Sequence, residues 1–348
     1  MVSKWRSGVV AVILAILGEI SQVTTTNAQD PSATLEDLKS QLLELDRQKK
    51  YADAIPLAEQ YVALTRTSLG EEHPRHVNAV GVLALLYQSQ HRYSEAELLF
   101  KRALALDEKI HGLEHPDVAA DLDELASLYV EQKRYSDAET LYKRALSITE
   151  RMRGPDHADV ATALNKLAGL HRAQNRPRES EPLLKRALSI QEKALGADHA
   201  SVGSTLEALA KLYDSQGRRG EVEPLLKRAL AIKETVLGVD HPDLRNLLND
   251  LAFRSRMDDR YAEAEQLYRR VVAITEKALG PDHPKVAAAL NELAFLYQMQ
   301  SHYADAEPLY RRALAVMEKA LGPDHPELRT WLDRLASARD PPALPGRQ

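Results

Sequence analysis

A histidine beside an acidic residue returns along this chain at a constant interval. The motif Gly-x-Asp/Glu-His-Pro/Ala occurs seven times, and each copy starts 42 residues after the previous one. The glycines that open the copies are Gly70, Gly112, Gly154, Gly196, Gly238, Gly280 and Gly322. Paired histidine and carboxylate side chains could bind a metal ion, work as a catalytic dyad, or mark the boundaries of helices. Each interpretation requires something different from the rest of the sequence.

The metal and dyad interpretations both fail on the arrangement of the copies. Zinc ligands all lie about 2 Å from one ion, whereas histidines in neighbouring helical hairpins are separated by at least a helix diameter, about 10 Å. A dyad needs a nucleophile, but no serine recurs beside the histidines and the chain has no cysteine. We therefore predict no metal site, no catalytic residue and no cofactor, and we interpret the motifs as helix boundaries.

The residues between the motifs have the periodicity of two amphipathic helices. Between residues 284 and 326, apolar residues at spacings of three and four define a first helical stripe, formed by Leu290, Leu293, Ala294 and Tyr297. After a polar break, a second stripe is formed by Tyr303, Ala306, Tyr310, Ala313, Leu314 and Met317. The pattern recurs in the other units, so the sequence predicts an all-α fold, an α-solenoid of stacked antiparallel helical hairpins.

The motif lies at the junction between two such hairpins. Gly280 directly follows a second helix, where glycine can take the left-handed conformation that closes a helix C-terminus. Pro284 suits the first position of the next helix, and Asp282 is expected to interact with the free amides and the positive dipole end there. His283 then lies at the cap itself. The recurring histidines are thus predicted to be structural.

Composition and charge limit the classes of function. The 348 residues carry a net charge of -5, which excludes a dedicated nucleic-acid surface. The unbroken period leaves no room for a separate catalytic domain, and the chain has no glycine-rich phosphate loop, so we expect it not to be an enzyme. Six second helices carry a glutamate four residues before a base, and we interpret these pairs as a solvated face. The pairs are Glu97 and Lys101, Glu139 and Lys143, Glu181 and Lys185, Glu223 and Lys227, Glu265 and Arg269, and Glu307 and Arg311.

The first 28 residues differ from the repeats. Lys4 and Arg6 precede an apolar run over residues 8–17, and small residues near Ala28 offer a cleavage point. This pattern predicts a signal peptide over residues 1–28, a short linker at 29–33, and an exported product that is periplasmic or secreted. The apolar run is too short to span a bilayer, so no stable membrane span is expected after cleavage. The alternative is an uncleaved leader that holds the chain at the membrane.

The stretch ALNELAFLYQMQSHYADAEPLYRRALAVMEKALGPDHP at 289–326 closely resembles the tetratricopeptide repeat, in the 42-residue form found in kinesin light chains. The resemblance rests on the two stripes of apolar and small residues, repeated in register. It covers residues 34–338, as about seven hairpins and a C-terminal capping helix that contains Leu328, Leu332 and Leu335. The remaining residues, 339–348, form a Pro-rich tail that we expect to be disordered.

The resemblance implies a right-handed superhelix whose concave surface, lined by the first helices, binds a peptide or a partner protein. Family members hold the ligand backbone with asparagines of the first helix, and one column of this chain matches them at Asn165, Asn249 and Asn291. In other hairpins the same column holds Gly81, Asp123, Glu207 and Asp333. One and two turns further along this face the sequence places Lys211, Phe253 and Phe295, then Arg172, Arg256 and Gln298.

Residue chemistry also favours binding at this face. Asparagine both donates and accepts hydrogen bonds, so it can pair with a peptide group, and exposed phenylalanine beside arginine is a mixture enriched at interfaces. We therefore expect a non-enzymatic, exported scaffold that binds a peptide or partner protein in the groove. Two alternatives stay open. These residues could be ordinary solvated helix positions, or the chain could be a self-assembling structural subunit of a cell-envelope complex.

Overall fold

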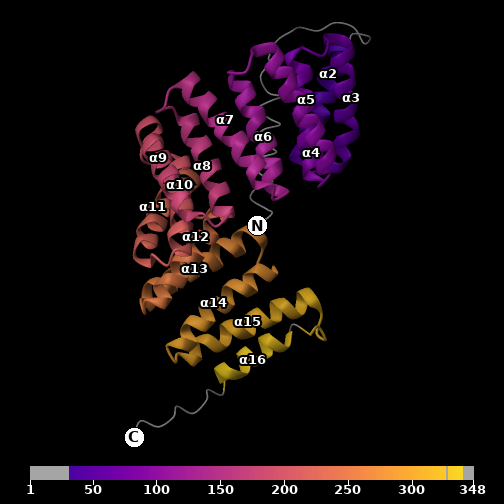
Figure 1. Cartoon of the computed structure of the whole chain (residues 1–348). Coiled ribbons are helices and arrows are strands. Elements are labelled where there is room, and N and C mark those ends of the chain that lie inside the picture. The colour runs from indigo at the N-terminus through magenta and orange to yellow at the C-terminus, as the bar shows by residue number, and fades with distance from the viewer. Residues whose placement is uncertain (1–30, 327, 340–348) are drawn as a thin grey trace. The chain divides into compact units, whose positions relative to one another are not determined.

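The computed structural model describes residues 31–326 and 328–339, which form fifteen α-helices and one 3-10 turn, with no strand among these residues (Figure 1). The predicted all-α fold of consecutive helical hairpins is confirmed. The predicted signal peptide at 1–28 lies outside the described residues, as do residues 340–348 of the predicted tail. Helix α2 already begins at Pro31, so the predicted linker at 29–33 is helical in its second half.

The first of two compact units ends at Ile190 and contains four consecutive hairpins, the last of which runs slightly beyond it. In each hairpin a first helix of 16 or 17 residues is followed by a second helix of 19 residues. The helices are α2 (Pro31–Arg47), α3 (Tyr51–Leu69), α4 (Pro74–Ser89), α5 (Tyr93–His111), α6 (Pro116–Glu131), α7 (Tyr135–Arg153), α8 (Ala158–Ala173) and α9 (Pro177–Leu195).

The second unit begins at Gln191 and holds three further hairpins and a last described helix. Its helices are α10 (Ala200–Ser215), α11 (Arg219–Leu237), α12 (Arg245–Met257), α13 (Tyr261–Leu279), α14 (Pro284–Met299), α15 (Tyr303–Leu321) and α16 (Leu328–Arg339). Helix α12 is shorter than the other first helices because the 3-10 turn η1 (Pro242–Leu244) replaces its opening turn. None of the described helices is long and apolar enough to cross a membrane.

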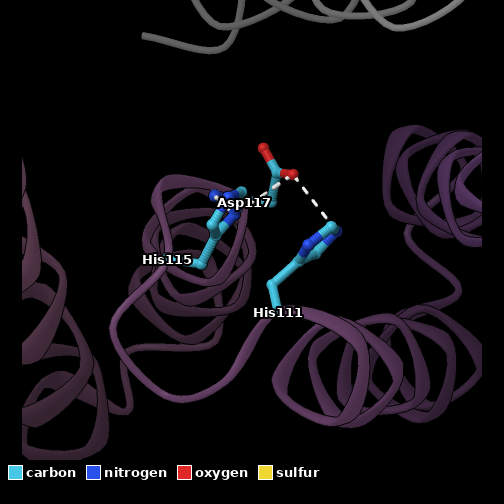
Figure 2. A group of neighbouring side chains, drawn as sticks. All are labelled: His111, His115 and Asp117. Atoms are coloured by element: carbon cyan, nitrogen blue, oxygen red, sulfur yellow. Dashed lines mark hydrogen bonds and ion pairs between the residues drawn. The ribbon is translucent and has the colours of Figure 1, made fainter.

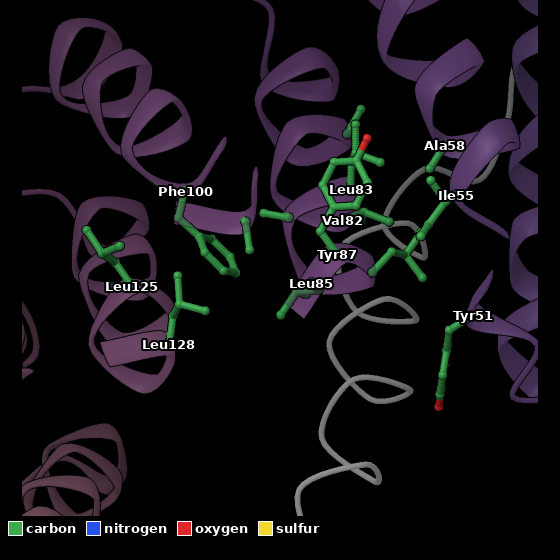
Figure 3. Packing of buried hydrophobic residues seen from close by; sticks show 14 of the residues in the cluster. Tyr51, Ile55, Ala58, Val82, Leu83, Leu85, Tyr87, Phe100, Leu125 and Leu128 are labelled. Atoms are coloured by element: carbon green, nitrogen blue, oxygen red, sulfur yellow. The ribbon is translucent and has the colours of Figure 1, made fainter. Parts of the chain in front are cut away.

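The apolar stripes predicted from the sequence form the core. Figure 3 shows this packing in the first unit, where α3 contributes Tyr51, Ile55 and Ala58, α4 contributes Val82, Leu83, Leu85 and Tyr87, α5 contributes Phe100, and α6 contributes Leu125 and Leu128. Buried alanines such as Ala84 and Ala96 lie between these large side chains and let neighbouring helices approach closely. Phe100 is only 2% exposed, so truncating it to alanine should cost about 3–5 kcal/mol.

The junctions between hairpins share one capping geometry. In six of them, Nδ1 of the motif histidine accepts a hydrogen bond from the backbone amide two residues further on, at 3.1 to 3.3 Å. The motif glycines have φ between +83° and +93°, as predicted for the end of a second helix. In six of these glycines ψ lies between 150° and 172°, which is outside the left-handed helical region and is a combination open almost only to glycine. The role predicted for the histidines as helix boundaries is confirmed.

At four junctions the acidic residue before the histidine has a different role from the one predicted. The carboxylate of Asp282 binds the ammonium of Lys319 on α15, whereas the amide at the start of α14 is capped by His283. Equivalent pairs join Asp240 to Lys277 at 2.7 Å, Glu114 to Arg151 at 2.7 Å, and Glu72 to Lys109 at 2.5 Å. Because the imidazole already accepts the amide bond, the acid is left to bind a base 37 residues further on. It thereby ties a junction to the following second helix.

The six predicted glutamate–base pairs on the second helices all form, with nitrogen–oxygen distances between 2.5 and 2.9 Å. In five of the six helices, the arginine next to the base also pairs with a glutamate on the preceding second helix. Examples are Arg144 with Glu108 at 2.7 Å and Arg270 with Glu234 at 2.5 Å. The basic residues of this face are therefore engaged by carboxylates, as expected for a solvated face, and each pair adds only about 0.2–1 kcal/mol.

Candidate functional site

The predicted ligand-binding face of the second unit is carried by α12 and α14. Phe253 and Arg256 lie on α12, one turn apart, and Phe295 occupies the equivalent place on α14. Four large apolar side chains are exposed on these two helices. Phe253 is 49% exposed, Phe295 42%, Met257 59% and Met299 44%. Exposed apolar side chains gathered in one place are typical of an interaction surface.

A pocket of about 330 Å³ opens on this face. It is lined by Arg256, Asn291, Glu292, Phe295, Gln298, Tyr310 and Arg334. Four of these residues belong to the predicted peptide-binding set, and Phe253 adjoins them through its ring, whose centre is 5.1 Å from the Arg256 guanidinium carbon. The structure thus brings five of the predicted residues together within the second unit.

Arg256 is the central charge of the pocket. The residue is only 8% exposed, and its guanidinium carbon lies 5.1 Å from the ring centre of Phe253 and 5.0 Å from that of Phe295. Nη1 donates to Glu292 at 3.3 Å, while the buried Nε has no hydrogen-bond partner among the described residues. A cation held between two aromatic faces gains from the ring quadrupoles. Its position is therefore set before any ligand arrives.

Asn291 and Gln298 are held by neighbouring side chains at the pocket wall. Nη1 of Arg334 donates a hydrogen bond to the side-chain oxygen of Asn291, and the hydroxyl of Tyr310 donates to Oε1 of Gln298 at 2.8 Å. Burial raises the pKa of Tyr310 to about 12, so the hydroxyl keeps its proton at neutral pH. The predicted polar groups thus have defined orientations.

The other predicted residues lie outside this pocket. Lys211 is exposed on α10, and Asn249 is half-buried on α12, one turn before Phe253. In the first unit, α8 carries Asn165, which is half-buried, and Arg172, which is exposed. The structure therefore does not gather all nine residues at one place in either unit.

In the first unit, the asparagine column contains a different kind of contact. Asp123 on α6 accepts a hydrogen bond from Nζ of Lys166 on α8 at 2.8 Å. Burial raises the pKa of Asp123, and the nearby Lys166 ammonium opposes that rise. This side chain bridges two first helices, so it is already engaged before any ligand binds.

The sequence reasoning missed three pocket residues, namely Glu292, Tyr310 and Arg334. Tyr310 was assigned to the core stripe, and only 1% of it is exposed, yet its hydroxyl reaches Gln298. A signal for Arg334 does exist in the sequence. It directly follows the column position of its helix, as Lys166 does in α8, and both bases bind the column residue of the preceding hairpin. A basic residue directly after the column position therefore predicts that it binds the column residue of the preceding hairpin.

The sequence model of the tetratricopeptide repeat matches this chain six times, at residues 45–109, 83–151, 117–193, 159–235, 243–319 and 285–340. Together these matches cover most of the sequence. The chain belongs to the tetratricopeptide repeat family. The predicted membership is thereby confirmed, and proteins built from tetratricopeptide repeats generally mediate protein–protein interaction. No curated protein sequence matches the chain.

Among solved structures, kinesin light chain-like repeat arrays are similar to this tetratricopeptide repeat protein. The nearly identical TPR-like repeats of a kinesin light chain candidate from Podosopora anserina share 27% identity, with a TM-score of 0.51 over 60% of this chain and 99% of that one. BtubC (BKLC) from P. vanneervenii shares 21% identity, with a TM-score of 0.52 over 68% and 92%. A STAND protein with a tetratricopeptide repeat sensor from Pyrococcus horikoshii shares 13%, with a TM-score of 0.61 over 97% and 50%. The last two show the fold alone.

Proposed function

We propose that this tetratricopeptide repeat protein is a non-enzymatic scaffold that binds a peptide or a partner protein in the groove formed by α12, α14 and α16. One observation carries the proposal, namely the placement of Arg256. Its buried guanidinium lies between two exposed phenylalanines at the wall of a 330 Å³ pocket. Arginine and aromatic residues gathered in this way are the composition of binding hot spots.

The chemistry of the pocket indicates the kind of segment that it binds. Two arginines, Arg256 and Arg334, face one carboxylate, that of Glu292, so the pocket carries an excess positive charge. A carboxylate of the ligand can accept hydrogen bonds from the Arg256 guanidinium in a charge-assisted pair. The rings of Phe253 and Phe295 offer a surface to an apolar side chain beside it. The preferred ligand is an extended segment with an apolar residue next to an acidic one.

The test is a peptide selection followed by direct affinity measurement. A random peptide library is selected on residues 29–348, and the dissociation constant of the enriched peptide is measured by fluorescence anisotropy. We expect Arg256→Gln and Phe295→Ala each to weaken binding by about tenfold or more. Leu98→Ala is the matched control, because Leu98 is a 70% exposed apolar residue on α5 in the first unit.

The control should leave the affinity unchanged. Replacing the acidic residue of the peptide by the corresponding amide should weaken its binding to the parent chain. The same replacement should have a smaller effect on binding to the Arg256→Gln variant. Equal affinities for the parent and both pocket variants, with unchanged circular dichroism, would place binding elsewhere and rule out this groove.

We also propose that the chain is exported, and the support for this is separate from the groove. The N-terminal sequence matches a cleavable leader, with basic residues at Lys4 and Arg6, an apolar run at 8–17 and small residues before Gln29. The test is to express the full chain with a C-terminal tag, fractionate the cells and sequence the N-terminus of the product. A product that begins near Gln29 in the periplasm or the medium supports export. A product that keeps residues 1–28 and sediments with membranes supports the alternative of a leader that anchors the chain.

A self-assembling structural subunit of a cell-envelope complex is the second candidate, and one observation favours it. Leu332 is 49% exposed on α16, the last helix that the structure describes. Repeat arrays bury the apolar face of each unit against the next. Light scattering over a range of concentrations tests the idea. A mass that rises with concentration and returns to that of a monomer in Leu332→Glu supports assembly, and a constant monomer mass excludes it.

A further inference from the structure

A second group of side chains lies outside the proposed groove, where α5 ends and α6 begins (Figure 2). His111 is the last residue of α5, His115 caps α6, and Asp117 lies in the first turn of α6. Oδ2 of Asp117 is 3.6 Å from Nε2 of His111 and 3.3 Å from Nδ1 of His115. One ligand atom from each side chain lies within 4.8 Å of the other two. The group is at the surface, so an ion can enter it from solvent.

The two imidazoles lie against one another. Their ring centres are 4.2 Å apart and their planes differ by 15°, so the rings are stacked. Figure 2 shows the carboxylate of Asp117 directed at both rings. Two imidazoles and one carboxylate form a ligand set preferred by zinc and related divalent transition metals, whereas calcium and magnesium take oxygen ligands.

Three polar residues at this junction depart from the repeat, and all three come from one copy. His111 stands where the other copies have Leu69, Arg153, Leu195, Leu237, Leu279 and Leu321. Asp107 stands where they have Thr65, Thr149, Gln191, Lys233, Thr275 and Met317. Asp121 stands where they have Ala79, Ala163, Thr205, Leu247, Ala289 and Trp331. A structural role shared by all copies does not explain departures confined to one of them.

The two additional aspartates, Asp107 and Asp121, are close to one another, and Asp107 also approaches His111. Asp107 is 6% exposed, and its Oδ1 lies 3.9 Å from Nε2 of His111. The side chains of Asp107 and Asp121 form a hydrogen-bonded carboxyl pair. Burying two acidic groups side by side is unfavourable. A cation held beside His111 would offset part of this cost, because it adds positive charge close to Asp107.

We propose that His111, His115 and Asp117 bind a divalent zinc-type metal ion through one nitrogen of each imidazole and one carboxylate oxygen. Three such ligands about 2.0–2.2 Å from zinc lie roughly 3.4 Å from one another in tetrahedral geometry. The two measured distances from Asp117 are close to that value, so side-chain rotations suffice to form the site. Asp107 approaches the same Nε2 of His111 at 3.9 Å, so it is placed to add negative charge beside the ion. The fourth position is open to water or to a donor from another molecule.

Motif histidines of different hairpins are at least a helix diameter, roughly 10 Å, apart and cannot share an ion. His111 and His115 belong to one junction and are four residues apart, so this separation does not exclude a metal between them. Nδ1 of His115 also caps α6, with a long hydrogen bond of 3.3 Å from the Asp117 amide. A metal bound at that nitrogen replaces this bond, so zinc binding and capping use the same lone pair.

The test measures zinc binding to the full chain, prepared without a polyhistidine tag and stripped with a chelator. Isothermal titration with Zn²⁺ is expected to show one ion per chain, and Co²⁺ in its place is expected to give visible absorption bands of a bound tetrahedral ion. His111→Leu should weaken zinc binding at least about tenfold. This variant should fold, because leucine is the residue at this position in five other copies.

His157→Gln provides the matched control. His157 caps α8 through the amide of Asp159 as His115 caps α6, but Arg153 occupies the place of His111 in that copy. The control should therefore bind zinc like the parent, whereas His115→Gln should not. Equal zinc affinity in the parent and His111→Leu would overturn the site, as would a parent chain that shows neither heat of binding nor cobalt bands.

Discussion

The guanidinium of Arg334 on α16 donates a hydrogen bond to the side-chain oxygen of Asn291 on α14, 43 residues earlier in the chain. The same interval separates Asp123 from Lys166, whose side chains meet at 2.8 Å. In both places, the column that was predicted to hold a ligand backbone is bridged to the next first helix. Asn291 therefore acts as part of the pocket wall, with its oxygen engaged by Arg334.

This contact predicts a difference between two asparagines of the same column. Asn291→Ala should lower the free energy of unfolding by about 1–3 kcal/mol, because it removes the acceptor of the Arg334 hydrogen bond at a position that is only 7% exposed. Asn249→Ala, one hairpin earlier at a half-buried position, should change it by less than about 0.5 kcal/mol. Urea denaturation followed by circular dichroism measures both. Similar losses in the two variants would show that the Arg334 contact contributes nothing.

The histidine caps predict a second stability effect. His283→Ala should cost about 0.5–2 kcal/mol, because the amide of Lys285 loses its acceptor, whereas His283→Asn should retain most of the stability through its own side-chain oxygen. His302 is the control. It precedes α15 but makes no side-chain capping bond, so His302→Ala should have a smaller effect. Thermal and urea unfolding measure the stability of the three variants. Equal stability of His283→Ala and His283→Asn would contradict the capping role.

Glu139 predicts how stability depends on pH. Hydrogen bonds from Lys143 and Arg176 lower the pKa of this carboxyl group to about 2, from an ordinary value of 4.5. Because the pKa of the folded state is the lower one, the carboxylate stabilises the fold above about pH 4.5, and that contribution is lost as the pH falls toward 2. Glu139→Gln should therefore be less stable at neutral pH and should lose less stability on acidification.

The measurement for Glu139 is the urea midpoint at a series of pH values. Glu44→Gln serves as control, because Glu44 is an exposed carboxylate on α2 whose nearest base, Arg47, is 3.6 Å away. The control should follow the parent chain at every pH. A parallel pH profile for Glu139→Gln and the parent would mean that the two hydrogen bonds do not couple protonation to folding.

Two glycines predict opposite effects of the same substitution. Gly280 has φ +84° and ψ 157°, so Gly280→Ala should destabilise the chain by about 1–3 kcal/mol through backbone strain, although nothing lies within 4 Å of the added Cβ. Gly81 lies inside α4 with equally open space around its Cβ. Gly81→Ala should therefore stabilise the chain by about 0.5–1 kcal/mol. Thermal unfolding of both variants decides, and a shift in the same direction would contradict the argument.

Local features of this fold could be predicted because they depend on neighbouring residues. The apolar spacing from Leu290 to Tyr297 identified a helix, and Gly280 with Pro284 located the boundary on either side of the histidine. The part assigned to Asp282 was wrong because two acceptors competed for one helix end. The imidazole of His283 accepts the amide bond, and the carboxylate binds Lys319 instead.

The sequence by itself determined the repeat, the helical hairpins, the caps and the family, since each follows from patterns within a span of 42 residues. The tertiary structure alone decided that Arg256 and Arg334 share a pocket and that Asp117 of α6 faces His111 of α5. These arrangements depend on how each helix is rotated against its neighbour and on which rotamers the contact allows. Neither quantity is encoded in the spacing of residues along one helix.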